Sequence, residues 1–296
     1  MTRPERITIG TRGSALALKQ ADIVKAALTA AEPSLSIDIR VIETRGDADQ
    51  RPIPLDTVGK GWFTKEIEEL LLTGEIDLAV HSLKDMAEDM PEGLNIGAYL
   101  PREDARDVLV TKNGEPLEAL KRGAVVGTDS ARRQVQMLAL RPDVKMESVR
   151  GNVPTRLEKL SSGNYDAIII AAAGLKRLGL EARVTRYFEP NEMTPAPGQG
   201  ILAVQAKKGG ALDDILKKIQ DADAARAARI ERSFSKAMGG GCKSPTGAYA
   251  FRQGNKCVLI GMRETDDKKV IREELRAPWE DSHSLGERLA RKFLEA

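Results

Sequence analysis

One cysteine lies in a segment whose composition favours thiol chemistry. Cys242 follows three glycines and precedes Lys-Ser-Pro, after a helical pattern and before a predicted strand. Glycines allow positive φ and leave the sulfur uncovered, and the neighbouring Lys243 favours the thiolate over the thiol. We therefore interpret Cys242 as an exposed nucleophile, with an ordinary helix stop as the open alternative. Cys257 lies in an apolar run and is predicted to be a core residue of a strand.

A second set of residues has the chemistry of anion binding. Arginines recur beside the ends of predicted strands, at Arg12, Arg132, Arg133, Arg150, Arg156 and Arg177. Ligands of α/β sheets bind at the carboxyl ends of strands, and the guanidinium fork suits carboxylates and phosphates. The most specific segment is 127–133, where hydroxyl residues precede a helix start that can offer backbone N–H groups. The recurrence predicts a polyanionic ligand, although any single arginine could be an ordinary exposed side chain.

The segment His81-Ser82-Leu83-Lys84-Asp85 follows a predicted strand and adds a carboxylate and an ammonium group. A carboxylate at Asp85 could stabilise a developing cation or accept a proton, and Lys84 could pair with ligand carboxylates. A solvated Lys-Asp pair is the alternative interpretation. With His81 and His283 as the two histidines, and no ligand spacing among histidines and cysteines, we expect neither a Ser-His-Asp triad nor a metal site.

Composition limits the classes of protein that the chain can belong to. Its 296 residues predict two or three domains, and the formal net charge of +2 does not indicate nucleic-acid binding. With two cysteines, no apolar leader and no long apolar run, we expect a soluble cytoplasmic protein without a membrane partner.

These residues must be positioned by elements that the apolar pattern predicts. Short apolar runs alternate with helical patterns through the first two thirds of the chain, which indicates parallel or mixed sheets with helices on their faces. Strands are expected at 7–9, 37–42, 76–80, 108–110, 124–127, 144–149, 167–170 and 201–204. Helices are expected at about 14–28, 63–72 and 223–238, with Ser14, Ser130 and Thr155 as helix caps.

The last third differs in pattern and predicts a small α+β domain. Strands at hairpin spacing are expected at 247–251, 257–262 and 270–275, followed by a helix from about Ser284. The charged stretch 101–107 is interpreted as a hinge and 190–197 as a linker. The predicted organisation is a discontinuous α/β domain of residues 1–100 and 200–220, a second α/β domain of 101–199, and an α+β domain of 221–296.

Taken together, these motifs resemble the porphobilinogen deaminase family of tetrapyrrole biosynthesis over essentially the whole chain. The motifs that carry the resemblance are Thr11-Arg12-Gly13-Ser14, Thr44-Arg45-Gly46-Asp47, Gly59-Lys60-Gly61, Ala79-Val80-His81-Ser82-Leu83-Lys84-Asp85, Arg132-Arg133-Gln134, Arg150-Gly151-Asn152-Val153, Ala173-Gly174-Leu175-Lys176-Arg177, Pro197-Gly198-Gln199-Gly200 and Gly240-Gly241-Cys242. So many motifs in one order make a chance match very improbable.

The resemblance implies a transferase with two periplasmic-binding-protein-like α/β domains and a smaller domain that carries the cofactor. In the family a dipyrromethane is thioether-linked to the cysteine that matches Cys242, and four porphobilinogen molecules are condensed on it head to tail with loss of ammonia. Asp85 matches the carboxylate that stabilises the cationic azafulvene. The residues implied to bind cofactor and substrate are Arg12, Ser14, Ser82, Lys84, Thr128, Ser130, Arg132, Arg133, Arg150, Arg156, Arg177 and Gln199.

The chain departs from the family pattern at a few positions. Asp129 stands where a serine is expected and places a negative charge near the carboxylate-binding groups, which puts that position's role in binding in doubt. Met86 and Ala87 follow Asp85 where a proline is usual, Lys243 replaces a glutamine, and Trp62 replaces an aliphatic residue. None of these changes removes a residue of the implied chemistry, and we expect a monomer.

Two other functions remain open on the sequence alone. A non-catalytic anion-binding protein could use the same two-lobed scaffold, because fold alone does not specify function. A DNA-binding regulator could sense an anion with the same lobes, but it would need a helix-turn-helix module that the remaining residues do not indicate.

Overall fold

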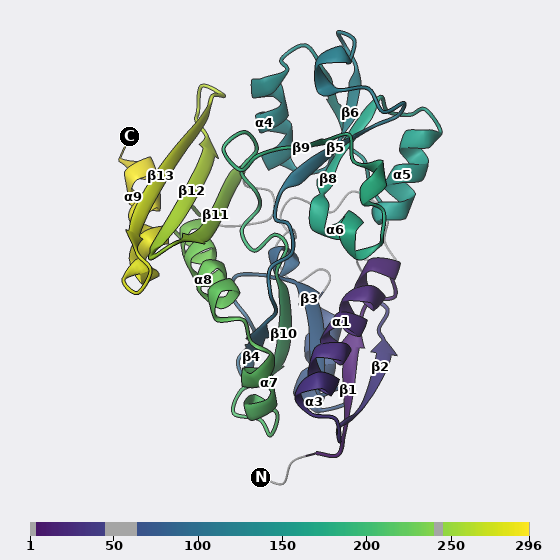
Figure 1. Cartoon of the computed structure of the whole chain (residues 1–296), viewed down its shortest axis with the longest axis vertical. Helices are drawn as coiled ribbons and strands as arrows, with labels where there is room; N and C mark the ends of the chain where they lie inside the picture. The colour runs from purple at the N-terminus through teal and green to yellow at the C-terminus, as the bar shows by residue number, and fades with distance from the viewer. Residues whose placement is uncertain (1–3, 45–63, 240–244, 296) are drawn as a thin grey trace. The chain divides into compact units, whose positions relative to one another are not determined.

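The computed structural model describes residues 4–44, 64–239 and 245–295 (Figure 1). These residues form two compact units. Unit 1 consists of Met1–Arg102 with Ile201–Arg226, and unit 2 of Glu103–Gly200 with Ala227–Ala296.

Unit 1 contains a five-stranded mixed sheet in the order β2-β1-β3-β10-β4. Its strands are β1 (Arg6–Thr11), β2 (Ser36–Val41), β3 (Leu78–Ser82), β4 (Leu94–Tyr99) and β10 (Leu202–Lys207). β1 runs parallel to β2 and β3, whereas β10 runs antiparallel to β3 and β4. The chain therefore returns to unit 1 through β10, which lies beside β3.

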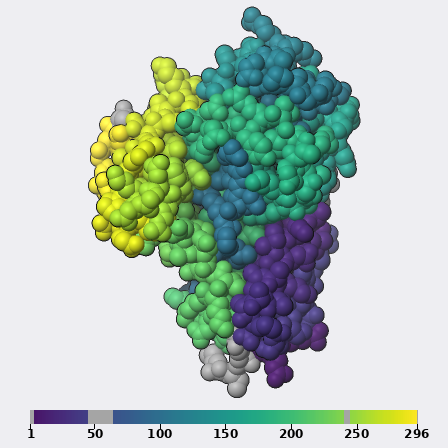
Figure 2. Space-filling view, viewed as in Figure 1, coloured from purple at the N-terminus to yellow at the C-terminus, as the bar shows by residue number. Residues whose placement is uncertain are grey.

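Helices cover both faces of this sheet. The helices are α1 (Ala15–Ala31), α3 (Lys65–Thr73) and α7 (Asp213–Ile219). Side chains alternate along β3, so that Leu78 and Val80 join the core under α1 and α7 while Ala79 joins the core under α3. On the face drawn in Figure 2, the purple residues of the chain's start form much of the surface of unit 1.

The second sheet, in unit 2, has the order β7-β6-β8-β5-β9. Its strands are β5 (Asp107–Thr111), β6 (Val125–Gly127), β7 (Lys145–Glu147), β8 (Ala167–Ala171) and β9 (Arg186–Tyr187). The helices beside it are α4 (Ala131–Leu140), α5 (Val153–Ser161) and α6 (Ala172–Arg177), and the short 3₁₀ turns are η2 (Leu117–Ala119) and η3 (Glu181–Arg183). α4 shares a core with Leu109 and Val126, and α5 shares another with Val108 and Ile170.

The C-terminal part of unit 2 is a three-stranded antiparallel sheet in the order β11-β12-β13 with helices on one face. Its elements are α8 (Ala222–Ala237), which belongs to this unit from Ala227 onward, β11 (Thr246–Gln253), β12 (Lys256–Glu264), β13 (Val270–Pro278), η4 (Ser282–Ser284) and α9 (Leu285–Leu294). Phe234 and Phe293 meet edge to face with ring centroids 5.8 Å apart. A Cβ at Gly261 would lie 2.6 Å from Leu289 Cδ2, so a larger residue there would displace the Leu289 side chain of α9.

The structure confirms the predicted fold class of two α/β sheets and a small α+β part. Cys257 is fully buried in β12, as predicted for a core residue. The division into three domains at the residues given above stays a prediction. Within the described residues, no helix is long and apolar enough to cross a membrane.

Several local predictions need correction. The hinge-like stretch ends in Asp107, which begins β5 and is completely buried, because it pairs with arginines from α4. The strand predicted at 144–149 is only the short β7, and the strand predicted at 76–80 runs instead from Leu78 to Ser82, which places His81 inside β3.

Two of the three predicted helix caps are confirmed. The side chains of Ser14 and Ser130 accept hydrogen bonds from backbone N–H groups of α1 and α4. Thr155 is wrong as a cap, because Asn152 holds that position and accepts from the Thr155 N–H at 3.0 Å. The proline in the first turn of α5 suits a helix that begins at Val153.

Candidate active site

One group of predicted site residues gathers at an edge of the sheet in unit 1. Arg12 directly follows β1, and Ser82 ends the neighbouring parallel strand β3, so both lie at the carboxyl ends of strands. Ser14 caps α1 beside Arg12, and the Gln20 side chain of α1 donates to Ser82 Oγ at 2.9 Å. The structure thus brings the predicted residues of this unit to the place where α/β sheets bind ligands.

The predicted catalytic carboxylate lies in the 3₁₀ turn η1 (Leu83–Asp85), directly after β3. The turn is closed by the Met86 N–H, which donates to Leu83 O at 3.1 Å, and the Leu83 side chain is fully buried. Asp85 itself is exposed, and no described residue forms a hydrogen bond or ion pair with its carboxylate. Its backbone is therefore well anchored while its charge remains available.

A series of side-chain hydrogen bonds joins α3, β10 and β3, the strand that precedes this turn. Gln205 Nε2 donates to Glu68 Oε1 at 3.0 Å, so Gln205 Oε1 is left to face His81 Nε2 at 3.0 Å. We assign the proton of the neutral imidazole to Nε2 on this basis. Burial lowers the pKa of His81 to about 4; the hydrogen bond that its ring donates to Gln205 Oε1 opposes this shift, and the charge of Arg12 adds to it. His81 is therefore neutral at pH 7.

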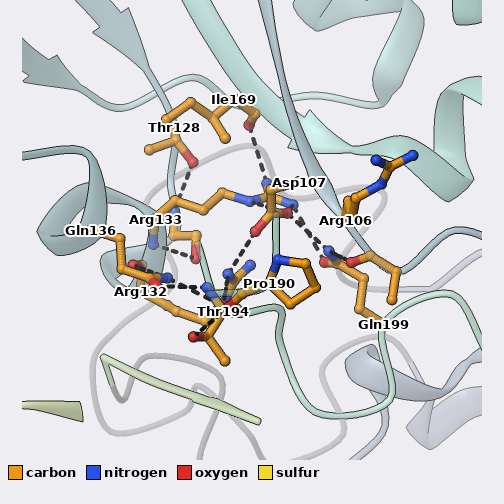
Figure 3. Close-up of polar contacts among 12 residues, drawn as sticks. Arg106, Asp107, Thr128, Arg132, Arg133, Gln136, Ile169, Pro190, Thr194 and Gln199 are labelled. Carbon is orange, nitrogen blue, oxygen red and sulfur yellow. Dashed lines mark hydrogen bonds and ion pairs between the residues drawn. The ribbon is translucent and has the colours of Figure 1, made fainter. Parts of the chain in front are cut away.

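In unit 2, two predicted arginines share one buried carboxylate, that of Asp107 (Figure 3). Arg132 Nη1 lies 2.6 Å from Asp107 Oδ2, and Arg133 Nε and Nη2 lie 3.0 and 2.7 Å from Oδ1. Gln199 Nε2 donates to the same Oδ1 at 2.9 Å and to Ala105 O at 2.7 Å. The structure thus gathers Arg132, Arg133 and Gln199 around a residue that the sequence analysis did not select as a site residue.

The charges of this cluster do not cancel. Burial by itself would raise the pKa of Asp107, but the two guanidinium groups and the bond from Gln199 hold it well below its usual range. Two guanidinium groups and one carboxylate leave an excess of one positive charge in a buried place. An excess of this kind favours an anion nearby.

The two arginines differ in what they can offer such an anion. All three nitrogens of Arg133 are engaged, since Nε and Nη2 bond Asp107 and Nη1 donates to Ile169 O at 3.1 Å. Arg132 uses only Nη1, and within the described residues its Nε and Nη2 make no hydrogen bond. Nε and Nη2 form one edge of the guanidinium, which is the fork that suits a carboxylate.

The segment leading into α4 contains three further polar residues of interest. Thr128 is fully buried and its Oγ1 accepts from the Ser130 N–H at 3.3 Å. Ser130 caps α4 by accepting from the Arg133 N–H. Asp129, the residue that departs from the family pattern, forms an ion pair with Arg150 Nε at 3.3 Å and accepts from the Ser148 hydroxyl. The extra negative charge is therefore paired with a predicted site arginine.

The remaining predicted residues of unit 2 bond backbone carbonyl groups. Arg156 Nε donates to Gly151 O at 2.8 Å, and Arg177 Nη2 donates to Gly200 O at 2.7 Å. Burial lowers the pKa of Arg177 to about 10, opposed by Glu103, so it stays charged at pH 7. Cys242 lies outside the described residues.

Asp107, Gln205, Glu68 and the buried Gln136 of α4 were missed by sequence reasoning. One signal existed for Asp107, because it directly precedes the apolar run at 108–110 and would be buried with it. The glutamines carried no such signal, since each is a polar residue inside an otherwise helical or strand-like pattern.

Comparison with known proteins identifies the family. Residues 7–213 match the model of the porphobilinogen deaminase, dipyromethane cofactor binding domain, and residues 225–295 match that of the porphobilinogen deaminase, C-terminal domain. Porphobilinogen deaminase of Roseiflexus castenholzii is 45% identical, with 98% of this chain and 96% of the relative aligned. That of Syntrophobacter fumaroxidans is also 45% identical, with 90% of this chain and 86% of the relative aligned.

Among solved structures, the chain is similar to the open GlnP substrate binding domain 2 of Lactococcus lactis, with a TM-score of 0.43 and 12% identity. That alignment covers 74% of this chain and 90% of the other. The two family models together span nearly the whole sequence, and the relatives are similar over nearly their whole length. The chain belongs to the porphobilinogen deaminase family.

Proposed function

We propose that the chain is a hydroxymethylbilane synthase. It condenses four porphobilinogen molecules head to tail, with loss of ammonia at each step, on a dipyrromethane held by a thioether at Cys242. The observation that carries this proposal is the match of residues 7–213 to a dipyromethane cofactor binding domain. The geometry of both units supports it.

The residues of the described site fit a group of this kind. Each pyrrole carries an acetate and a propionate, so the primer and the growing product are polyanions. The positive excess around Asp107 and the open Nε–Nη2 edge of Arg132 suit a carboxylate. The proposed binding residues are Arg12, Ser14, Ser82 and Lys84 in unit 1, and Thr128, Ser130, Arg132, Arg133, Arg150, Arg156, Arg177 and Gln199 in unit 2.

The binding residues would differ in how they reach a ligand. Arg132 would bind a carboxylate without giving up a protein partner, because its fork is open. Arg133 would have to exchange Asp107 or Ile169 O for the ligand, since all of its nitrogens are engaged. Arg150 would bring Asp129 with it or release it.

Asp85 is the proposed catalytic residue. The bound dipyrromethane supplies the pyrrole carbon to which the first substrate is joined. As ammonia leaves porphobilinogen, positive charge develops on the substrate pyrrole, and the Asp85 carboxylate stabilises it. Because no described residue neutralises that carboxylate, its full charge acts on the substrate. Lys84, the preceding residue of the turn, binds a substrate carboxylate.

We also propose that the enzyme works as a cytoplasmic monomer that binds neither nucleic acid nor membrane. The nearly balanced charge, 46 basic against 44 acidic residues, supports the absence of a nucleic-acid partner. Sedimentation of the purified protein at micromolar concentration tests the monomer, and a dimer mass would contradict it.

The reaction itself separates this proposal from its rivals. Purified protein incubated with porphobilinogen should release ammonia and form a linear tetrapyrrole, with four ammonia molecules released for each product molecule. A non-catalytic binding protein would retain porphobilinogen without releasing ammonia. A DNA-binding regulator would shift the mobility of random DNA at low salt, which we do not expect here.

A further inference from the structure

A buried glutamine in α4 has every hydrogen-bonding position of its amide occupied. Gln136 lies one helical turn after Arg132 and is fully buried. Its Nε2 donates to Arg132 O at 3.1 Å and to Thr194 O at 3.2 Å. Its Oε1 accepts from the Thr194 N–H at 2.7 Å and from Arg272 Nη2 at 2.9 Å. An amide with two donated and two accepted bonds has one orientation only.

The Thr194 carbonyl connects this glutamine to the guanidinium of Arg132. Thr194 O accepts from Arg132 Nη1 at 2.6 Å as well as from Gln136 (Figure 3). Arg132 Nη1 is thereby held between Thr194 O and Asp107 Oδ2. With one nitrogen fixed on two sides, the planar guanidinium can present its open Nε–Nη2 edge in one direction only.

Arg272 brings the C-terminal sheet into the same network. It projects from β13, bonds Gln136 and the carbonyl of Glu192 through Nη2, and leaves its buried Nε without a hydrogen-bond partner. Burial lowers the pKa of Arg272, opposed by Glu192. A buried N–H without a hydrogen-bond partner costs free energy, so Arg272 is held in this place by the two bonds of its Nη2.

A second contact ties the Thr194 segment to the C-terminal sheet. The Ala248 N–H of β11 donates to Pro195 O at 3.0 Å. A Cβ at Gly247 would lie 2.8 Å from Thr194 O, so only glycine permits this approach. β11 begins at Thr246, four residues after Cys242. The carbonyl that orients Arg132 is therefore held from the strand that follows the proposed attachment cysteine.

We propose that Gln136 and Arg272 are positioning residues for the recognition of pyrrole carboxylates, which they serve by fixing the Thr194 carbonyl and, through it, the open edge of Arg132. The inference rests on the proposed function, in which Arg132 binds a carboxylate of the primer or of porphobilinogen. Neither residue touches the ligand. Their loss lets the guanidinium rotate, so binding weakens while the chemical step is preserved.

The test uses steady-state kinetics of the holoenzyme with porphobilinogen, normalised to the dipyrromethane content measured by mass. Gln136→Glu keeps the size and the acceptors of the side chain but removes the N–H that holds Thr194 O. Arg272→Met keeps the length of the side chain and removes its bonds. In each variant we expect KM to rise about tenfold, because this is roughly the effect of losing one hydrogen bond to a charged group. We expect kcat to stay within about twofold of the wild-type value.

The matched control is Arg276→Met, which removes an exposed arginine of the same strand that pairs with Glu274. KM should not change in this control. Thermal midpoints are measured in parallel, so a variant that merely unfolds is recognised by its low midpoint and its reduced kcat. Gln136→Asn, which shortens the amide, serves if Gln136→Glu does not fold.

Double variants with Arg132→Lys decide whether the two residues act through Arg132. If they do, adding Gln136→Glu or Arg272→Met to Arg132→Lys raises KM no further. Unchanged KM in the single variants, or effects that multiply in full, would overturn the inference. If Arg132→Lys raises KM while Gln136→Glu and Arg272→Met leave it unchanged, the inference fails and the proposed function stands. Should Arg132→Lys leave KM unchanged, the proposed role of Arg132 fails and the inference fails with it.

Discussion

Arg132 and Arg133 are consecutive residues that share one carboxylate. Among the described residues, Nε and Nη2 of Arg132 make no hydrogen bond, whereas every guanidinium nitrogen of Arg133 is engaged. The difference arises from the helix, which turns successive side chains about 100° apart. The Arg133 side chain points between β5 and β8, where it bonds Asp107 and Ile169 O. The Arg132 side chain points toward Thr194 and donates to its carbonyl oxygen. Two neighbouring arginines therefore differ in function: Arg133 is fully bonded within the protein, whereas Arg132 can also bind a ligand.

Asp107→Asn should destabilise unit 2 strongly. The change leaves two buried guanidinium groups without a counter-charge, and breaking a buried pair from one side costs about 3–5 kcal/mol. For a unit of this size the thermal midpoint should fall by more than about 6 °C. Asp143→Asn removes a carboxylate that pairs with Arg141 nearer the surface, and it should lower the midpoint much less. Equal midpoints for the two variants would show that the buried cluster does not stabilise the fold.

Asp85→Asn should keep its dipyrromethane and still bind porphobilinogen, but turnover should fall about a hundredfold. A preorganised charge that acts on the transition state is typically worth about 3 kcal/mol, and asparagine preserves the shape without the charge. Single-turnover ammonia release measures the effect. Glu92→Gln, which neutralises an exposed carboxylate of the same unit, is the control. Near-normal turnover of Asp85→Asn would remove this residue from the mechanism.

His81 should make stability depend on pH. Its pKa is about 4 in the folded protein and 6.5 when exposed, so the unfolded chain takes up the proton first as the pH falls. The folded state therefore loses stability between about pH 6.5 and 4, by about 3 kcal/mol in total.

His81→Gln keeps a donor toward Gln205 and has nothing to titrate, so its thermal midpoint should decline less than that of the wild type across this range. The exposed His283 provides the control variant His283→Gln, whose decline should match the wild type. Parallel curves for His81→Gln and the wild type would mean that His81 is not buried as a neutral ring.

At the scale of elements, the start of α5 shows what local sequence can and cannot decide. Ser14 and Ser130 were predicted as caps because each directly precedes a helical pattern. At α5 the prediction passed over Asn152 and chose Thr155, which lies inside the first turn. Both residue types cap helices, and only the proline at the second helical position distinguishes the two starts.

Replacing Asn152, the residue that caps α5, should therefore lower the free energy of unfolding more than replacing Thr155, the predicted cap. Asn152→Ala removes the acceptor of the Thr155 N–H and should destabilise unit 2 by about 1 kcal/mol. Thr155→Ala removes one hydroxyl that donates to Asn152 and should cost a few tenths of that amount. Denaturant titration of both variants compares the two, and a larger loss for Thr155→Ala would restore the predicted cap.

Strands and helices were predictable from local patterns, whereas the side-chain contacts between residues distant in the sequence were not. Runs such as 167–170 are apolar throughout because both faces of that strand are covered, and this can be read from sequence. The edge strand β7 is short and largely exposed, so its apolar signal was weak and its length was overestimated. Site arginines could be selected by type and place, but Asp107 lies 25 residues from Arg132 and no local rule joins them.

At the scale of the whole molecule, the polar contacts that matter most join residues far apart in the chain. Gln136 meets Arg272 across 136 residues, and Gln199 meets Asp107 across 92. Such pairs form only when the sheets are in place, which is why motif matching could identify the family without revealing what orients its arginines.

The central claim is that Cys242 carries a covalent dipyrromethane on which the product is built, and the mass of the intact protein tests it most directly. The added mass should persist after reduction, because a thioether resists agents that remove a mixed disulfide, and peptide mapping should place it at Cys242. Cys257→Ser should stay modified and active, since Cys257 is buried in β12. Cys242→Ser should lose most of both, because a hydroxyl is a far weaker nucleophile. A freshly purified protein that shows only its sequence mass while still polymerising porphobilinogen would contradict the account.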